Sequence, residues 1–387
     1  MDICEKDMCL ACYCCENICP VDSITMKLDE YGQIYPYVDE NKCIKCNKCK
    51  NSCPQNTEPQ FRQPLDIYAS YSVDKNDRAT SASGGMASVF YDKIISEKGV
   101  AFGAKFENKL EVNIVPAETK EQLKEFKGSK YVQAAAGSSY KRVKEYLKSN
   151  KKVLYVGTPC QIDGLLNFLG KYANNDNLHT VDLICHGTPS IKYLQEYAYS
   201  IDKSSDKASF RGADNFVMQL YSGDKQVYSR PSNKDLYFTG FLSSLYYKKA
   251  CYQCQYAQEK RVSDITIGDF WGLGITKPFS EDAYKVSLAL VNTEKGKRFF
   301  ESCSSKLFVE KRDYAEAKEF NPQLNYPSKK HKDTDVFFEQ YKNVGFLEAV
   351  KATSIPQEIK EAVKQAKIDK IKYYKKRIFE KVFKKGE

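Results

Sequence analysis

The amino-terminal fold follows from residues 9–20, Cys-Leu-Ala-Cys-Tyr-Cys-Cys-Glu-Asn-Ile-Cys-Pro, whose spacing returns in residues 43–54, Cys-Ile-Lys-Cys-Asn-Lys-Cys-Lys-Asn-Ser-Cys-Pro. Both stretches follow the pattern C-x2-C-x2-C-x3-C-P, which binds [4Fe–4S] clusters in bacterial two-cluster proteins. Three cysteines two residues apart wrap a tight loop around one face of a cubane cluster. The fourth cysteine, followed by proline, points away and reaches the other cluster. The repeat therefore predicts a module that holds two [4Fe–4S] clusters.

This crossed arrangement assigns eight cysteines to two clusters. The predicted ligands of one cluster are Cys9, Cys12, Cys15 and Cys53, and those of the other are Cys43, Cys46, Cys49 and Cys19. Zinc is an alternative, but a zinc site needs four ligands and has no need of a repeated run with two prolines. We therefore predict an α+β, ferredoxin-like domain over residues 1–58. Cys4 and Cys14 lie outside the pattern, and we expect them to be spare thiols.

The composition bears on the compartment. The 387 residues include 15 cysteines, and 42% of the residues are hydrophobic, which is enough apolar material for two or three packed domains. Disulfide frameworks are typical of small secreted chains. This sequence shows neither a signal-peptide pattern nor an apolar run of about 18 residues. We therefore expect a cytoplasmic protein with reduced thiolates, from an anaerobe or a low-oxygen cytoplasm.

The net charge of +10 is concentrated near the end of the chain, where residues 357–387 carry eleven Lys and Arg against five Asp and Glu. Because the rest of the chain is closer to neutral, a nucleic-acid partner is not favoured. Apolar residues at near-helical spacing predict a basic amphipathic helix over residues 356–387. This helix would either pack on the body as a solvated helix, or make peripheral contact with a membrane or a partner.

A mixed α/β pattern follows a polar, proline-containing linker at residues 55–64. The apolar periodicity predicts strands at residues 67–71, 100–104 and 111–115 and a helix at residues 85–97. Ser81-Ala82-Ser83-Gly84-Gly85 opens this helix. The backbone N–H groups there would either receive a phosphate or form an ordinary N-cap.

Two later cysteines follow predicted strands. Cys160 comes after the apolar run 153–157, and Cys185 comes after a second run that ends at Ile184. The carboxyl ends of strands in an open α/β sheet are where ligands bind. With the pair Cys251-x2-Cys254 they make four thiolates, which predict either a third [4Fe–4S] cluster or a Cys4 zinc site. If Cys160 and Cys185 were merely buried small side chains, Cys251 and Cys254 would lack partners.

Five motifs occur in an order that resembles the coenzyme F420 hydrogenase/dehydrogenase beta-subunit family. They are Gly128–Gln133, Gly157–Gln161, Cys185–Pro189, Cys251-x-x-Cys254 and Asp264–Gly272. The resemblance covers about residues 65–320. It implies a mixed α/β flavin-binding region, with a family N-terminal domain at residues 65–150 and a family C-terminal flavin and cluster domain at residues 151–325.

The resemblance also implies an FAD-dependent oxidoreductase that exchanges electrons between iron–sulfur clusters and a hydride carrier such as coenzyme F420. Cys160, Cys185, Cys251 and Cys254 would then bind a third [4Fe–4S] cluster near the flavin. The implied flavin contacts are Ser83, Gly84, Gly85, Gly128, Ser129, Lys130, Tyr131, Gly157, Thr158 and Pro159.

The residue roles and partners leave alternatives. His186 would donate a proton to substrate or hydrogen-bond the flavin, or it is a satisfied structural histidine. Lys130 would pair with a phosphate or the flavin, or is a surface lysine. The chain itself would turn over a small-molecule substrate, or serve as a non-catalytic electron-transfer subunit. The expected partners are ferredoxin or a redox enzyme subunit.

Overall fold

The computed structural model describes residues 2–212 and 215–383. The strands are β1 Ile24–Leu28, β2 Ile34–Val38, β3 Asp66–Ser72, β4 Val100–Phe106, β5 Val112–Ala117, β6 Val153–Gly157, β7 Leu178–Leu183, β8 Lys207–Arg211, β9 Phe216–Ser222, β10 Lys225–Pro231, β11 Ile265–Asp269, β12 Ser287–Val291 and β13 Leu307–Arg312. The α-helices are α1 Cys14–Ile18, α2 Lys48–Asn51, α3 Lys75–Thr80, α4 Met86–Ser96, α5 Lys120–Leu123, α6 Ser139–Lys148, α7 Pro159–Leu169, α8 Ile191–Ile201, α9 Leu236–Leu242, α10 Glu294–Glu301, α11 Tyr314–Glu319, α12 Thr334–Lys351 and α13 Ile355–Phe383.

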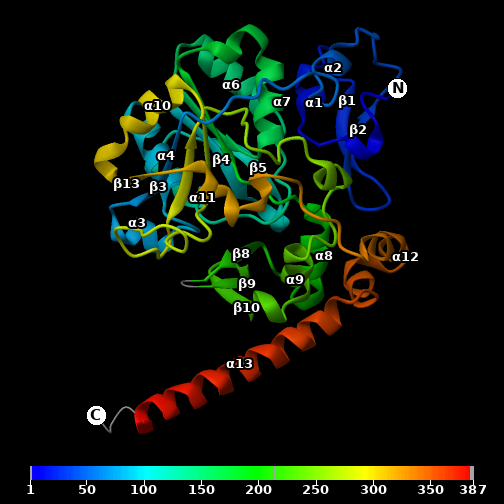
Figure 1. Cartoon of the computed structure of the whole chain (residues 1–387). Helices are drawn as coiled ribbons and strands as arrows, with labels where there is room; N and C mark the ends of the chain where they lie inside the picture. Colours follow the sequence, from blue (N-terminus) through cyan, green and yellow to red (C-terminus); the bar gives the residue numbers. More distant parts are fainter. Residues whose placement is uncertain (1, 213–214, 384–387) are drawn as a thin grey trace.

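The body is built on an eight-stranded sheet in the order β13-β3-β12-β11-β7-β6-β4-β5 (Figure 1). Its central strands β4, β6, β7 and β11 run parallel, and the strands toward both edges pair antiparallel. The predicted mixed α/β class is therefore confirmed. Residues 65–150 and 151–325 both contribute strands to this one sheet, because β3 of the first segment lies between β13 and β12 of the second.

Strand β6 shows why these residues form the centre of the sheet. All five of its residues are buried, as expected for a parallel strand that is covered on both faces. Val153 and Tyr155 pack with helices α6 and α7, whereas Leu154 and Val156 pack with α4 and α10. The two-residue period of a strand thus divides one apolar run between two cores.

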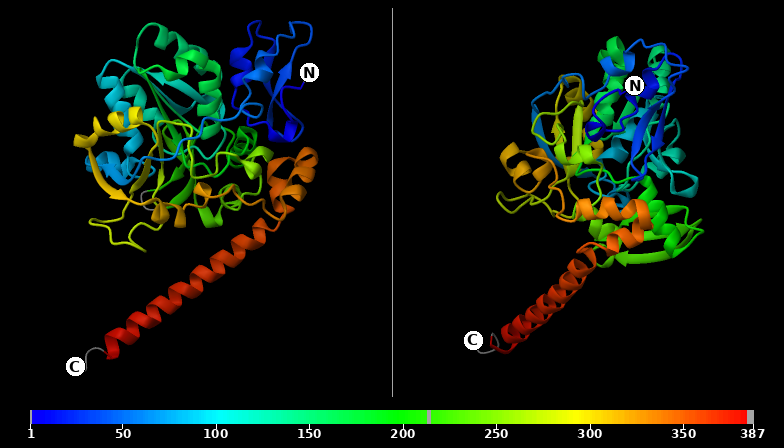
Figure 2. Two further views of the ribbon diagram at one scale, coloured as in Figure 1. Left: turned by 45° about the horizontal axis from the view of Figure 1, so that its top comes forward. Right: turned by 90° about the vertical axis from the view of Figure 1, so that its right-hand side faces the viewer.

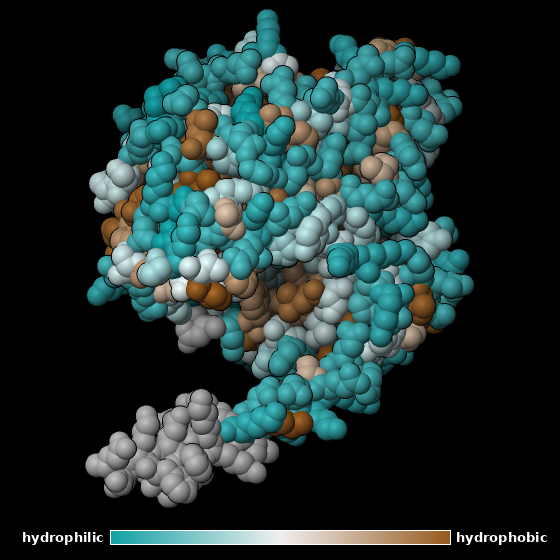
Figure 3. All heavy atoms as spheres, in the orientation of Figure 1, coloured by the Kyte–Doolittle hydropathy of each residue, from teal (hydrophilic) through white to brown (hydrophobic). Residues whose placement is uncertain are grey.

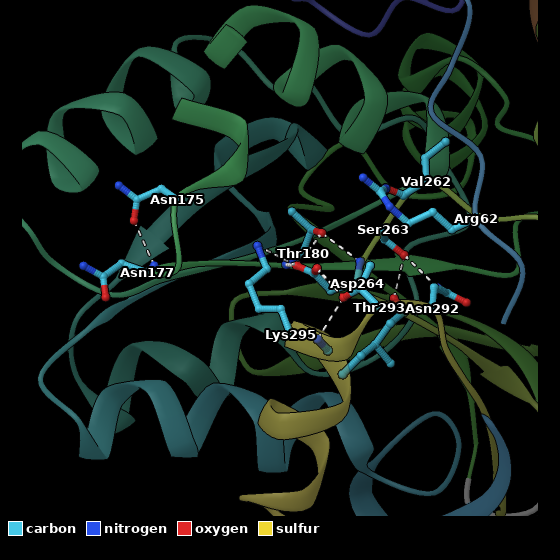
Figure 4. A network of polar contacts seen from close by, with 12 residues as sticks. Arg62, Asn175, Asn177, Thr180, Val262, Ser263, Asp264, Asn292, Thr293 and Lys295 are labelled. Carbon is cyan, nitrogen blue, oxygen red and sulfur yellow. Dashed lines mark hydrogen bonds and ion pairs between the residues drawn. The ribbon is translucent and has the colours of Figure 1, made fainter. Parts of the chain in front are cut away.

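A buried polar network holds the amino-terminal ends of β7 and β11 together (Figure 4). Asp264 accepts hydrogen bonds from the backbone N–H and the hydroxyl of Thr180, at 2.9 and 3.0 Å. Its other carboxylate oxygen accepts from the hydroxyl of Thr293 at 2.8 Å. The ammonium of Lys295 lies 3.4 Å from the oxygen that accepts from Thr180. Because both oxygens are paired, this buried carboxylate ties the sheet to the start of α10.

The N-terminal module packs against the helices on one face of the sheet (Figure 1). It contains the antiparallel hairpin β1–β2 and the short helices α1 and α2. The side chain of Asn17 donates to the carbonyl of Gly137 at 2.6 Å, and the Tyr140 hydroxyl donates to the carbonyl of Cys12 at 2.6 Å. Cysteine-bearing loops of the module are therefore fixed on α6 and the residues before it.

A second lobe carries the three-stranded sheet β8–β10 together with α8, α9 and α12 (Figure 1). Its core is rich in aromatic side chains, and Tyr193, Tyr237 and Phe337 are fully buried. The surface in Figure 3 is mostly hydrophilic, apart from a recess floored by apolar residues between this lobe and the sheet.

The predicted basic helix is present as α13, and residues 384–387 lie outside the described residues. Ile355 is buried and Ile359 packs against the aromatic core of the lobe, whereas residues 364–369 are exposed. Figures 1 and 2 show the rest of α13 projecting away from the body. Packing on the body therefore describes the first turns of α13 and not residues 364–369. Among the described residues, no helix is long and apolar enough to cross a membrane.

Candidate functional site

A cavity of about 320 Å³ opens at the carboxyl ends of β6, β7 and β11. It is lined by eight of the ten predicted flavin contacts, namely Ser83, Gly85, Gly128, Ser129, Lys130, Tyr131, Gly157 and Thr158. Cys160, Cys185 and His186 line it as well. The volume lies within the range of small-molecule sites, and the position is the edge of an α/β sheet where ligands bind.

The other two predicted contacts, Gly84 and Pro159, do not line the cavity. The N–H of Gly84 donates to the hydroxyl of Ser287 at 2.9 Å. A Cβ at Gly84 would lie 2.6 Å from the carbonyl oxygen of Ser70, so only glycine fits against the sheet there. Pro159 is buried as the first residue of α7, where its fixed φ suits a helix start. These two residues position the cavity wall.

Helix α4 begins at the cavity. Gly85 is its N-cap, with a φ of 85° that favours glycine, and no described side chain caps the first turn. Gly85, Met86 and Ser88 all line the cavity. The free N–H groups of this turn, together with the helix dipole, make a suitable place for an anionic group.

The ammonium group of Lys130 is already occupied by the backbone. It donates to the carbonyls of Glu125, Phe126 and Lys127 at 3.1, 3.1 and 3.0 Å. Burial lowers the pKa of Lys130 to about 7. Lys130 therefore neutralises the carbonyl end of the 3-10 helix Lys124–Phe126 and shapes the wall of the cavity. Lys130 is half-buried, and three backbone carbonyls already accept from its side-chain nitrogen.

A polar cluster lies at the carboxyl ends of β8 and β11. The guanidinium of Arg211 donates to Asp269 at 2.5 Å and to the hydroxyl of Tyr131 at 2.9 Å, and it lies 4.0 Å from the ring centre of Phe216. His186 faces the same cavity. Burial lowers the pKa of His186, while the charge of Asp269 opposes that shift. A neutral imidazole can donate through one nitrogen and accept through the other.

Arg211 and Asp269 had no predicted role. Asp269 ends β11 inside the Asp264–Gly272 motif, so its place at a strand end was a usable signal. Arg211 ends β8, an edge strand of the other lobe, and no pattern in its neighbourhood sets it apart.

The four central cysteines come together beside the cavity. Burial raises the pKa of Cys185 most, and the charges of the neighbouring thiols Cys251, Cys160 and Cys254 raise it further. Thr158 holds its hydroxyl 3.2 Å from the sulfur of Cys160. All 15 cysteines are free thiols. Within residues 2–212 and 215–383, no three His, Cys, Asp or Glu side chains are arranged to hold a single metal ion.

The cysteines of the N-terminal module fall into two groups. One small cavity is lined by Cys4, Cys9, Cys12, Cys14, Cys15 and Cys53, and a second is lined by Cys19, Cys43, Cys46 and Cys49. The fourth cysteine of each run thus lies with the other run, in the crossed arrangement that the spacing predicts. Each group contains the four thiols that its predicted cluster needs, which suits the donor chemistry of a [4Fe–4S] cluster.

Cys4 and Cys14, which the pattern leaves unassigned, lie within the first group. Hydrogen bonds with Cys53 and Cys9 raise the pKa of Cys4. The thiol of Cys14 donates to the carbonyl of Ser52 at 3.2 Å. Both are therefore neighbours of the predicted ligands.

Helix α7 joins the first group to the central cysteines. Cys160 lies in its first turn, and Gly164 follows four residues later on the same face. A Cβ at Gly164 would lie 3.1 Å from the sulfur of Cys12. The hydroxyl of Tyr140 donates to the carbonyls of both Cys12 and Gln161, at 2.6 and 2.8 Å. Burial raises the pKa of Cys12, and the charges of neighbouring thiols, Cys160 among them, raise it further.

Two models of known protein families match parts of the chain that contain these cysteines. The family model for the C-terminal part of the coenzyme F420 hydrogenase/dehydrogenase beta subunit matches residues 150–317, which contain all four central cysteines. Residues 150–317 are therefore similar to this family. A second family model, described as a 4Fe-4S binding domain, matches residues 36–57. The chain is therefore an iron–sulfur protein that resembles the beta subunits of coenzyme F420 hydrogenases and dehydrogenases.

Among curated proteins, no sequence matches the chain. Thirteen chains of solved structures match it. One is a chain of the F420-reducing [NiFe] hydrogenase complex from Methanosarcina barkeri, determined as a xenon derivative. It is 17% identical, with a TM-score of 0.47, and the match covers 79% of this chain and 93% of that chain.

Proposed function

We propose that the chain is a flavin-dependent iron–sulfur oxidoreductase with three [4Fe–4S] clusters, in which FAD occupies the cavity at the sheet edge. The observation that carries this proposal is the shared face of α7. It brings Cys12 of the N-terminal module next to Cys160, which in turn lines the cavity. A flavin beside one-electron centres converts between single-electron and hydride chemistry.

The cysteine groups would supply the iron ligands. Cys9, Cys12, Cys15 and Cys53 would hold one cluster and Cys19, Cys43, Cys46 and Cys49 a second, within a domain at residues 1–58. Cys160, Cys185, Cys251 and Cys254 would hold the third. The second group is the outward one, since Cys46 and the adjacent Ile44 are exposed, so this side of the chain would meet an electron-transfer partner.

The cavity residues would divide the binding of FAD among them. The N-terminus of α4, with Ser83 and Gly85, would receive the phosphates, while Gly128, Ser129, Gly157 and Thr158 would allow the ring system to lie close to the backbone. The Arg211–Asp269 pair would orient Tyr131 against the bound group. These assignments place the flavin site across segments 65–150 and 151–325.

His186 would move a proton at the open side of the cavity. Its lowered pKa keeps the imidazole neutral near pH 7, so one nitrogen can accept a proton while the other donates. The small-molecule substrate would enter from this side. Coenzyme F420 is the candidate that the family name favours, and the chain would work in a reducing cytoplasm.

The proposal is tested by blocking the cavity from within α4. Ser88 lines the cavity, whereas Ser96 lies at the far end of the same helix and is exposed. Anaerobically purified protein should release one FAD on denaturation, and S88W should release none, with iron content unchanged and S96W behaving as the unaltered chain. Iron-loaded protein without any flavin contradicts the proposal.

A second candidate function is a non-catalytic electron-transfer subunit, which the exposed second cysteine group favours. Docking to a redox enzyme would use that exposed side, and the projecting α13 would contact the same partner or a membrane surface. This candidate predicts a stable partner in pull-down experiments and no reduction of any small hydride acceptor. Turnover of coenzyme F420 or another acceptor by the isolated chain excludes it.

A further inference from the structure

Two adjacent lysines have opposite surroundings. Lys248 is 1% exposed and ranks among the largest fully buried side chains, while Lys249 is exposed and pairs with Asp7 at 3.1 Å. A buried ammonium is costly unless opposite charge compensates it. The buried charge of Lys248 therefore needs compensation from its surroundings, whereas the exposed Lys249 already pairs with Asp7.

The protein groups that contact the Lys248 ammonium are neutral. It donates to the carbonyl of Ile34 at 2.7 Å and lies 3.6 Å from the ring centre of Tyr35. Within residues 2–212 and 215–383, no carboxylate forms an ion pair with it. The carboxylate that acts on it from farther away, Asp29, is paired with Lys6 at 3.2 Å. One carbonyl and one aromatic face leave most of its charge uncompensated.

Two cysteines from different groups, Cys9 and Cys251, act on the charge of Lys248. Burial lowers its pKa, while the charges of Cys9 and Cys251 raise it. The hydrogen bond with Cys4 lowers the pKa of Cys9 to about 6, and the charge of Lys248 also lowers it. Burial raises the pKa of Cys251, and the charge of Lys248 opposes that rise. The backbone carbonyl of Lys248 also accepts from the N–H of Cys251 at 2.8 Å. Lys248 therefore lies between the first cysteine group and the central one.

We propose that Lys248 is a shared counter-charge for the two iron–sulfur centres on either side of it and favours their reduced forms. This inference rests on the proposed function, because it takes the first and central cysteine groups as cluster ligands. A cluster held by four thiolates carries negative charge that grows by one when it accepts an electron. A buried cation nearby stabilises that added charge, and net charge is a main determinant of cluster potential.

Lys248 would act on two of the three centres and not on the third. Cys9 and Cys251 mark the two centres that Lys248 serves, and their charges are the largest that act on it. The group of Cys19, Cys43, Cys46 and Cys49 is not among the main charges acting on Lys248. An electron arriving from the exposed group would thus be held at the junction where α7 joins the first group to the central one. The proposed effect is electrostatic and includes no proton transfer.

The test is an EPR-monitored redox titration of the full-length, iron-loaded protein with dithionite as reductant. K248M and K248Q remove the charge, K248R retains it, and K249M is the matched control. In K248M and K248Q, reduction of two of the three centres should become at least tenfold less favourable, which is about 59 mV for a one-electron couple. The third centre, K248R and K249M should match the unaltered chain.

Iron counts separate this inference from the proposed function. Full iron with unshifted potentials in K248M and K248Q overturns the role of Lys248 and leaves the cluster assignment standing, whereas an unaltered chain without three centres fails the proposed function itself. If both uncharged variants lose iron from these two centres, retention of that iron by K248R supports the proposal. Equal loss of iron in K248R overturns the proposal, because iron retention then depends on the shape of the lysine side chain and not on its charge.

Discussion

The two cysteine runs have the same spacing and lie in different surroundings. Cys9, Cys12 and Cys15 are all buried, and Cys12 touches Gly164 of α7. In the second run Cys49 and Cys53 are buried too, but Cys43 is half-buried and Cys46 is exposed. Identical ligand patterns thus become an inner and an outer position within one chain. The spacing determines what can be bound, and the packing of the rest of the chain determines which site faces a partner and which faces the cavity.

The largest expected effect comes from breaking the inner contact. G164V places a branched side chain where a Cβ already lies 3.1 Å from the sulfur of Cys12, so it should push the first group away from α7. Because electron transfer slows as the distance between centres grows, reduction of the cavity flavin by a protein electron carrier should be slower in G164V than in the unaltered chain. Stopped-flow absorbance of the flavin measures this rate.

The control for G164V is a variant that destabilises the fold elsewhere. D264N disturbs the paired carboxylate at the opposite edge of the sheet and should cost about 2 kcal/mol of unfolding free energy. Its rate of flavin reduction should stay unchanged. A G164V rate equal to that of the unaltered chain would show that the two groups do not communicate across α7.

Iron removal should sharpen the contrast between the runs. Since Cys46 is exposed and the first group is buried, an iron chelator should extract about four irons from the second group before the rest. C46S should abolish that fast phase. Release of all iron in one phase, measured by absorbance of the chelate, would remove the distinction between an inner and an outer site.

The smallest expected effect is a change in unfolding free energy that does not distinguish the two cysteine runs. His179, on β7, stacks on Phe299 with ring centres 4.4 Å apart, and burial lowers its pKa to about 4. The folded state therefore favours the neutral ring, so this contribution is complete above pH 6.5 and is lost as the pH falls toward 4. H179F should flatten the decline in unfolding free energy across that window by about 1–2 kcal/mol. An unchanged pH profile by chemical denaturation contradicts this.

Local patterns predicted the parts of the site that depend on spacing. The cysteine runs, the strands that end before Cys160 and Cys185, and the glycine-rich start of α4 are all short-range signals. The mixed α/β class followed from apolar periodicity in the same way. The flavin and the third cluster came from the resemblance and remain proposals.

The missed features depend on contacts between distant parts of the chain. Nothing in the sequence Tyr-Tyr-Lys-Lys separates buried Lys248 from exposed Lys249. Gly164 has no unusual feature in the sequence, and its role depends on contact with Cys12, 152 residues earlier in the chain. Arg211 finds its partner Asp269 only because the ends of β8 and β11 are close in the fold. The basic composition of α13 likewise did not predict that the helix projects away from the body.

The most direct test of the account is a count of iron, acid-labile sulfide, zinc and flavin in anaerobically purified protein. Three cubane clusters and one flavin site predict about 12 irons, about 12 sulfides and one FAD per chain, with no zinc. A chain with about eight irons and one zinc would contradict the central cluster, because the four thiols beside the cavity would then hold a redox-inert ion.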